Sequence, residues 1–502
     1  MRRARLGGCW GWTFSTTQKG MDISPSNESD EPATKRICAR CVDEPFLKAL
    51  IGAAGVEAYC SYCEAESRTI TIEELADHVE TAFDHHYERT PTEPEGLEAA
   101  MLSENEGSYS WKRHGEQVLW AIANAAGIKE EAAGDVVSVL EERHSDHESA
   151  KMGEECPFDK NSYYAEKNPG CDEFSAKWSE FENGLKTEAR FFSRSAQVTL
   201  DEIFADLPNL RTSKASPAVM SVGPEAEIKS LYRARVFAAE DEKLEEALKY
   251  PWEHLGPPPM LAATAGRMNA RGISVFYGAI ESATALAEVR PPVGSKVAIA
   301  KFTIERSLKL LDVEALKSVA ITGSIFDPGF MGLIQRANFL EILSGRISRP
   351  VMPNEEAFEY LATQAVADYL ATEAKLDGII FPSVQVGHAS SNVVLFHHSS
   401  RVTEVELPKG TDLTAILEQH DSDGVSPDYH VWEVVPRTPA TAAPSEPDPF
   451  NLDLTPVNYE LFDPRIPSLK IDFASVTVHH IKAVNFNADE YPVKRYHTVE
   501  PE

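Results

Sequence analysis

The stretch AGRMNARGISVFYGAIESATALAEVR, residues 265–290, decides the fold of the middle of this chain. A polar loop with two glycines leads into ISVFYGAI, a run rich in β-branched and aromatic residues that predicts a strand carrying Tyr277. The residues ATALAEVR then predict a short helix that ends before two prolines, with Glu288 at the edge of its apolar face. The order of loop, strand and helix therefore brings Arg267, Tyr277 and Glu288 close together.

Spacing alone leaves two interpretations of this stretch open. In the structural one, Arg267 lies on the surface, Tyr277 in the core, and Glu288 in a salt bridge at a helix end. In the functional one, the three side chains bind a nucleotide. A guanidinium binds phosphate through paired hydrogen bonds, and a tyrosine ring stacks on a flat base. A carboxylate stabilises the positive charge that grows on a ribose as its C–N bond breaks.

The segments around this stretch predict a mixed domain over residues 225–400. Short strand-like runs flank it, and a longer helical pattern lies between them. Together they predict an α+β or α/β domain. The strand-like runs are SLYRARVFAA, KVAIAKFTI, DGIIFPSV and SNVVLFHH, and the helical one is NEEAFEYLATQAVADYLATEAK.

The rest of the chain differs in texture. Residues 1–37 predict a disordered extension, whose basic start has the character of an overextended gene start. Residues 67–211 are mostly helical in pattern, and Thr71 and Glu74 stand at capping-box spacing. Residues 401–502 are an acidic, proline-rich extension with strand-like runs, SLKIDFASVTVHHI among them. The fold class predicted for the whole chain is therefore multidomain α+β.

Four cysteines form a separate module over residues 38–66. Cys38, Cys41, Cys60 and Cys63 follow the pattern C-x2-C-x18-C-x2-C, in which each close pair grips one metal ion from two sides. This spacing is typical of a tetrahedral four-thiolate zinc site, which leaves no open position and is structural. The alternative is a set of free or redox-active thiols. Other cysteines have no such spacing and are interpreted as plain thiols.

Composition restricts the function classes. The chain has 79 Asp and Glu against 48 Lys and Arg, a formal net charge of −31, which argues against broad nucleic-acid binding and favours a compact basic partner. No run approaches the roughly 20 apolar residues that span a bilayer. The seven cysteines in 502 residues do not indicate a secreted disulfide framework, so we expect a reducing cytoplasm.

Five pieces in order resemble the RES domain, a family named for its Arg, Glu and Ser. They are a strand carrying Arg233, the loop GRMN at residues 266–269, the Tyr277 strand, the ALAEV helix with Glu288, and a final piece in two parts. That final piece is FPS at residues 381–383, followed by a strand with Asn392. The resemblance covers about residues 225–400, and it favours the functional interpretation of the opening stretch.

The helical part resembles the HEPN-type domain that precedes RES in a longer subclass, most clearly at FENGLKTEARFFSRSA. HEPN domains that cut RNA carry an Arg, four to six residues, and then a His. Here RHSDH leaves three residues between Arg143 and His147. This departure argues against RNase activity and predicts an interaction or scaffold part. The other histidines nearby, His78, His85, His86 and His144, form no HExxH and are typical of solvated helix surface.

The RES resemblance implies an ADP-ribosyltransferase-like fold and NAD as substrate. RES domains are the toxin halves of toxin–antitoxin pairs, and members consume NAD by hydrolysis or phosphorolysis. The implied NAD-binding residues are Arg233, Arg267, Asn269, Tyr277 and Asn392. The arginines would hold the pyrophosphate or a ribose, Tyr277 would stack on nicotinamide, and Asn392 would support the wall beside it.

The resemblance also implies the catalytic residues, which are Glu288, Tyr277, Ser383 and Arg267. Glu288 would stabilise the oxocarbenium-like ribose as nicotinamide leaves, and Ser383 would hydrogen-bond the ribose or orient Glu288. Two rival functions stay open: a protein ADP-ribosyltransferase, and a non-catalytic protein that senses a nucleotide and binds a partner. An antitoxin is the expected partner.

Overall fold

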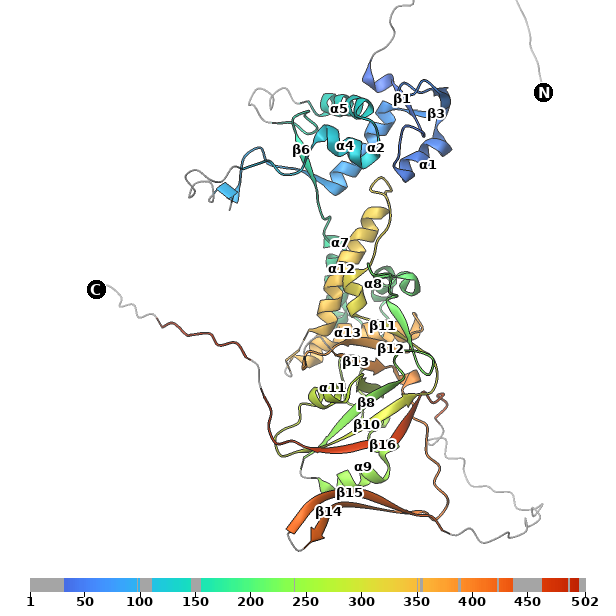
Figure 1. Cartoon of the computed structure of the whole chain (residues 1–502), viewed down its shortest axis with the longest axis vertical. Coiled ribbons are helices and arrows are strands. Elements are labelled where there is room, and N and C mark those ends of the chain that lie inside the picture. The colour runs from blue at the N-terminus through green and yellow to red at the C-terminus, as the bar shows by residue number, and fades with distance from the viewer. Residues whose placement is uncertain are drawn as a thin grey trace, which may run out of the picture. The chain divides into compact units, whose positions relative to one another are not determined.

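The protein is described by a computed structural model, shown in Figure 1. Contacts divide the chain into two compact units, Met1–Pro169 with Gly323–Met331, and Gly170–Thr322 with Gly332–Glu502. Most of the predicted extension at the N-terminus lies outside the described residues. The structure describes residues 31–96, 98–99, 111–145, 155–238, 240–349, 351–352, 355–386, 390–421, 424–436, 463–485 and 488–495.

The first unit is a helical core with two small sheets. Helix α2 starts with the predicted capping box, in which Thr71 Oγ1 accepts from the Glu74 backbone and the Glu74 carboxylate accepts from the Thr71 backbone. Its apolar face packs with α4 and α5 into one buried cluster. The strands form the sheets β1-β3-β2 and β4-β6-β5. The elements are β1 (Arg36–Cys38), α1 (Pro45–Ala54), β2 (Val56–Tyr59), β3 (Glu66–Thr71), α2 (Ile72–His86), β4 (Tyr87–Arg89), β5 (Glu116–Gln117), α4 (Val118–Ala126), α5 (Glu130–His144) and β6 (Tyr163–Glu166).

A segment from much later in the chain completes this core. Phe326 is only 4% exposed and belongs to the same buried cluster, and Ile325 packs against it. The segment Gly323–Met331 is accordingly part of the first unit. The helical pattern of the N-terminal sequence therefore does not contain the whole core of the unit that it builds.

The second unit contains an eight-stranded sheet in the order β16-β10-β8-β9-β13-β12-β11-β7. β11 and β12 pair in parallel, and the other neighbours pair antiparallel. All five runs predicted as strands around the opening stretch are confirmed, as β8, β9, β10, β12 and β13. The strands are β7 (Val219–Val222), β8 (Ser230–Phe237), β9 (Phe276–Ala279), β10 (Lys296–Ile304), β11 (Leu308–Asp312), β12 (Gly378–Pro382), β13 (Ser391–Leu395), β14 (Asp412–Asp421), β15 (Gly424–Val434) and β16 (Leu469–His480).

Helices of this unit pack against the sheet in three buried clusters. α7 and α8 share one cluster with α12 and α13, in which the ring centres of Trp178 and Phe339 lie 5.8 Å apart with the two rings tilted. Two helices of the predicted helical part, over residues 67–211, thus lie with the sheet rather than with the first unit. The helices are α7 (Asp172–Thr187), α8 (Arg194–Ile203), α9 (Asp241–Lys249), α10 (Pro251–His254), α11 (Ser282–Glu288), α12 (Phe330–Ser348) and α13 (Glu356–Thr372).

The C-terminal strand β16 is part of the main sheet, because it pairs with β10 from Leu469↔Ile304 to His480↔Lys296. β14 and β15 form a separate two-stranded sheet. The predicted strands of the C-terminal extension therefore exist, and one of them closes an edge of the central sheet (Figure 1). No described helix is long and apolar enough to cross a membrane.

Candidate active site

A cavity of about 470 Å³ opens in the second unit, within the size range of small-molecule sites. Strands β8 and β9 and helix α11 form one wall, the end of α12 and the start of α13 form the other, and the loop of Arg267 lies between them. Polar and charged side chains gather in it. Those lining the cavity are Tyr232, Arg233, Arg267, Tyr277, Glu288, Arg290, Ser348, Glu356, Tyr360 and Asn392.

Glu288 is held at the C-terminal end of α11 by two side chains from the neighbouring strands. Ser383 Oγ donates to Glu288 Oε1 at 2.6 Å, and Asn392 Nδ2 donates to the same oxygen at 2.8 Å. Sheet register explains their proximity, since Asn392 on β13 pairs with Ala279 of β9 and with Phe381 of β12. Ser383 is fully buried. Both hydrogen bonds fix the orientation of the carboxylate, which lines the cavity.

The loop at residues 266–269 is held by Tyr277. The Tyr277 hydroxyl accepts from Met268 N at 3.0 Å and donates to Asn269 Oδ1 at 2.9 Å. A side chain on Gly266 would meet both that hydroxyl and Asn269 Oδ1 at 2.7 Å, so the close approach requires glycine. Burial raises the pKa of Tyr277 to about 12, which keeps the hydroxyl protonated. The ring of Tyr277, rather than its hydroxyl, is left for a ligand.

Asn269 differs in position from the other predicted NAD-binding residues. It is 4% exposed, and its Nδ2 atom donates to three carbonyl oxygens, those of Thr264, Ala270 and Ile273. It is not among the residues that line the cavity. These bonds satisfy the amide within the loop, so the structure places Asn269 behind the cavity wall as a support of the Arg267 loop.

Two arginines bring positive charge into the cavity. Arg267 Nη1 donates to the carbonyl of Ile347 at 2.6 Å, and its guanidinium lies 5.5 Å from the ring centre of Tyr360. Arg233 lies over the ring of Phe276, and its buried Nη1 atom has no hydrogen-bond partner among the residues that the structure describes. Burial lowers the pKa of Arg233 to about 10, so it remains charged at neutral pH. An anionic ligand would satisfy this charge.

Five polar or charged lining residues were not predicted from the sequence: Tyr232, Arg290, Ser348, Glu356 and Tyr360. Glu356 and Tyr360 stand four residues apart on α13, so they lie on one face of that helix. Arg290 follows Glu288 by two residues and has a φ of 43°, a left-handed conformation that is costly for a residue with a side chain. The helical spacing could have suggested that Glu356 and Tyr360 share a face of one helix. It could not have suggested that this face lines the same cavity as α11.

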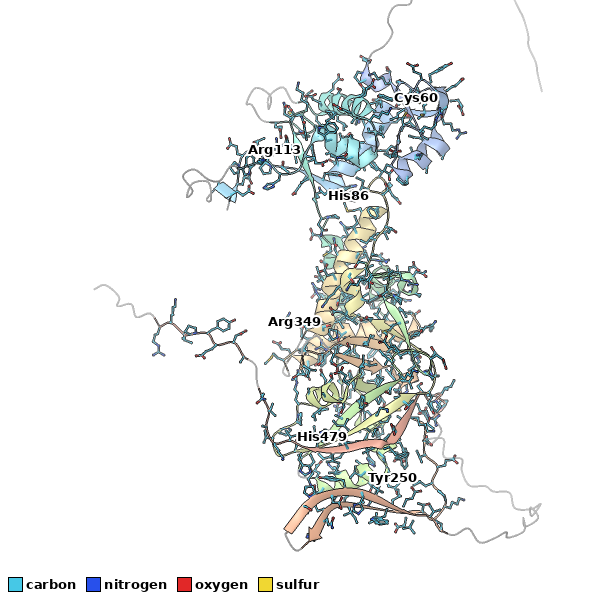
Figure 2. The ribbon with its side chains drawn as sticks, in the orientation of Figure 1. Cys60, His86, Arg113, Tyr250, Arg349 and His479 are labelled. Carbon is cyan, nitrogen blue, oxygen red and sulfur yellow. The ribbon has the colours of Figure 1, made fainter. Side chains whose placement is uncertain are left out.

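The four predicted metal ligands lie together in the first unit. Their sulfur atoms all lie within 4.8 Å of one another, with Cys38–Cys41, Cys38–Cys63 and Cys41–Cys60 separations of 3.8, 3.6 and 3.8 Å. Four thiolates at about 2.3 Å from a tetrahedral zinc ion would be about 3.8 Å apart. Cys60 is labelled in Figure 2. The sulfur geometry therefore fits a zinc ion.

The surroundings of the cysteines tie this module to the helical core. Tyr62, within the second cysteine pair, donates to Asp135 of α5 at 2.7 Å, and Lys35 bonds the same carboxylate at 2.9 Å. Glu64, directly after the pair, has a φ of 57°. The backbone is therefore left-handed directly after the second cysteine pair, a conformation that is costly for a residue with a side chain.

The Arg143 region of the helical part forms ion pairs. Arg143 Nη1 contacts Asp77 at 2.7 Å and Glu80 at 3.1 Å, and His144 Nε2 contacts Glu80 at 2.7 Å. His147 lies outside the described residues. The prediction of a solvated surface is wrong for His86, which is 6% exposed because the end of α2 packs near Phe330, with the two rings 6.1 Å apart. Burial lowers the pKa of His86.

The fold is a mixed α+β architecture with a helical N-terminal region and a sheet-rich domain that holds a charged cavity. The family model described as RES domain matches residues 230–417, and that of HEPN/RES N-terminal domain 1 matches residues 53–199. The chain is therefore a RES-domain protein with a HEPN/RES N-terminal domain, which confirms both resemblances.

A solved structure gives a more distant likeness. The crystal structure of the M. tuberculosis MbcT-MbcA toxin–antitoxin complex is 12% identical, with 47% of this chain and 91% of that chain covered and a TM-score of 0.20. No curated protein matches this chain.

Proposed function

We propose that the RES domain of this chain cleaves the bond between nicotinamide and ribose in NAD. The observation that carries this proposal is the Glu288 carboxylate, oriented by Ser383 and Asn392 in a cavity that also holds Arg233 and Arg267. A fixed carboxylate beside buried guanidinium groups suits a substrate that is anionic at its phosphates and becomes cationic at a ribose carbon.

In the proposed reaction the C1′–N bond breaks and its electron pair leaves with nicotinamide. The ring is cationic in NAD and neutral once released, so no proton needs to be donated to it. Glu288 Oε1 accepts both hydrogen bonds from the protein, which leaves the carboxylate's other oxygen to face the ribose. Water or phosphate then attacks C1′ and loses a proton. The enzyme is thus a glycohydrolase or a phosphorylase, and positioning and electrostatics lower the barrier.

The remaining side chains bind and orient the substrate. Arg233 and Arg267 neutralise the pyrophosphate, and the unpaired Nη1 atom of Arg233 is a donor available for it. The ring of Tyr277 lines the cavity and stacks on the nicotinamide, while its hydroxyl holds the Arg267 loop. Ser383 is then an orienting residue, and Asn392 both orients Glu288 and lines the wall.

Release of nicotinamide from NAD, with and without phosphate, tests this function. Glu288→Gln keeps the shape but removes the charge, and we expect it to lower the rate about 100- to 1,000-fold. Glu281→Gln is the matched control, because Glu281 is exposed at the other end of α11 and makes no side-chain cap. No release by the wild-type protein would contradict the proposal, and equal release by Glu288→Gln would contradict the role of Glu288.

The same experiment separates the hydrolase from its rival. ADP-ribose that becomes attached to protein would identify a protein ADP-ribosyltransferase, since both reactions share the step that expels nicotinamide. Phosphate-dependent release would identify a phosphorylase. Absence of turnover with retained nucleotide binding would identify a nucleotide-sensing protein.

The proposal extends to the setting of the enzyme. The match to the RES domain supports the role of a toxin in a toxin–antitoxin or defence system. The protein would act in the cytoplasm and would have an antitoxin protein as its partner. The first unit would serve as an interaction part, because Arg143 is engaged by carboxylates rather than free for RNA cleavage. The cysteine site would hold a structural zinc ion, for which the sulfur spacing is the support.

A further inference from the structure

Two buried side-chain atoms without a described hydrogen-bond partner lie in the cavity, one on each of its two walls. Five side-chain atoms are buried without a hydrogen-bond partner among the described residues, and two of them, Arg233 Nη1 and Ser348 Oγ, belong to residues that line this cavity. Buried polar groups without partners are costly and rare, so each invites an explanation. Ser348 lies on the wall opposite Glu288, at the end of α12, where its neighbour Arg349 is labelled in Figure 2. A ligand that reaches both walls would satisfy both atoms.

The wall opposite Glu288 consists of Ser348, Val351, Glu356 and Tyr360, and we call it the α13 wall. The Tyr360 hydroxyl lies 3.3 Å from Glu356 Oε1, so these two polar groups act together. Both side chains are half-buried, and both are reached from the cavity. The wall therefore presents one carboxylate and two hydroxyl groups to a ligand.

Helix α13 is hydrogen-bonded to the Arg267 loop. Thr363 Oγ1 donates to the carbonyl of Arg267 at 2.7 Å, and Gln364 Nε2 donates to the carbonyl of Gly266 at 2.8 Å. Arg267 itself lies against the Tyr360 ring. These contacts join the backbone of the loop to the helix that carries Glu356.

Charges of both signs line the cavity, which holds the Arg267 guanidinium together with one carboxylate on α11, Glu288, and another on α13, Glu356. Burial lowers the pKa of Arg267, and the charges of Glu288 and Glu356 oppose that shift. A dinucleotide carries matching groups, with a ribose, an anionic diphosphate and a second ribose.

We propose that the α13 wall binds the second ribose of the dinucleotide, with the Glu356 carboxylate accepting hydrogen bonds from its two hydroxyl groups and Ser348 supporting it. This rests on the proposed function, because it assumes that the first ribose lies at Glu288. A carboxylate placed at ribose hydroxyls repels a 2′-phosphate, as in dinucleotide sites that select the unphosphorylated cofactor. Glu356 therefore makes the enzyme specific for NAD over NADP.

Binding of ADP-ribose and of ADP-ribose 2′-phosphate, measured by calorimetry on the full chain, tests the α13 wall without any turnover. We expect the wild-type protein to prefer ADP-ribose and Glu356→Gln to weaken its binding about tenfold or more, because bonds to a charged acceptor are lost. The preference over the 2′-phosphate should shrink by a similar factor. Ser348→Ala should weaken ADP-ribose binding severalfold.

Glu359→Gln is the matched control. Glu359 stands one turn along from Glu356 on α13, is 53% exposed, contacts Lys186 at 3.6 Å and does not line the cavity. Unchanged binding by Glu356→Gln at an unchanged melting temperature would overturn the α13 wall and leave the proposed function standing. Binding that depends on Glu356 in a protein that releases no nicotinamide would uphold the wall and remove the proposed function. A wild-type protein that binds neither ligand would overturn the α13 wall, while nicotinamide release would still decide the proposed function separately.

Discussion

The cysteine site and the cavity are built in opposite ways. All four cysteines lie between residues 38 and 63, and their sulfur atoms contact one another. The cavity instead collects residues from 232 to 392, from four strands, three helices and a loop. A site whose ligands are close in sequence is visible in local spacing, whereas a cavity depends on strand order and on helices that arrive from elsewhere.

The two sites also differ in how their polar groups are satisfied. The cysteine module is closed, since Tyr62 is bonded to α5 and four thiolates would complete the coordination of one ion. In the cavity, Arg233 Nη1 and Ser348 Oγ have no hydrogen-bond partner within the described part of the chain. A buried polar group without a partner calls for an explanation such as a ligand, so this contrast in hydrogen bonding separates a structural site from a functional one.

The largest effect should come from the closed site. We expect Cys60→Ser to lose the zinc ion and to unfold the first unit cooperatively, because a structural zinc site contributes on the order of 10 kcal/mol to folding. Metal content by mass spectrometry and thermal unfolding by circular dichroism measure this. Cys156→Ser is the control, since Cys156 is outside the quartet. A wild-type protein that contains no metal would show that the cysteine site is not a structural metal site, and the contrast with the cavity would fail.

An intermediate effect should come from the open site. Ser383→Ala removes the 2.6 Å bond to Glu288, and we expect nicotinamide release to fall about 10- to 100-fold with folding retained. Ser282→Ala, in the first turn of the same helix and away from the cavity lining, serves as the control. If Ser383→Ala lowered the melting temperature but not the rate, the bond would be structural, and the contrast with the cysteine site would weaken.

The smallest effects come from the backbone. Both sites contain a residue with a side chain at positive φ, Glu64 beside the cysteines and Arg290 beside Glu288. Replacing either with glycine should stabilise its unit by about 1 kcal/mol or less, since glycine adopts this conformation without strain. We expect Arg290→Gly to weaken NAD binding as well, and Glu64→Gly to leave zinc content unchanged. Equal, purely stabilising effects at both positions would show that the strain at Arg290 has no functional role.

Much of the fold could be predicted because its signals are local. Alternating and β-branched runs identified five strands, the Thr71–Glu74 spacing identified the start of α2, and the cysteine spacing identified the candidate metal site. The order of Arg233, Arg267, Tyr277 and Glu288 identified one wall of the cavity. The sequence did not predict which helix, strand or loop each element would pack against.

Four features were decided by tertiary structure alone. β16 closes the sheet edge at β10, Phe326 completes the core of the first unit, and α13 brings Glu356 opposite Glu288. Asn269 belongs to the same group, because only its three bonds to loop carbonyls show that it supports the loop.

The sequence by itself determined which residues prefer strand, helix or tight loop, and which side chains can hold a metal ion or bear charge. The tertiary structure decided which of those side chains face the same space. The physical reason is that backbone preference acts over a few residues, whereas a cavity is formed by burial and sheet register between segments more than 100 residues apart, such as Glu288 and Asn392 at a separation of 104.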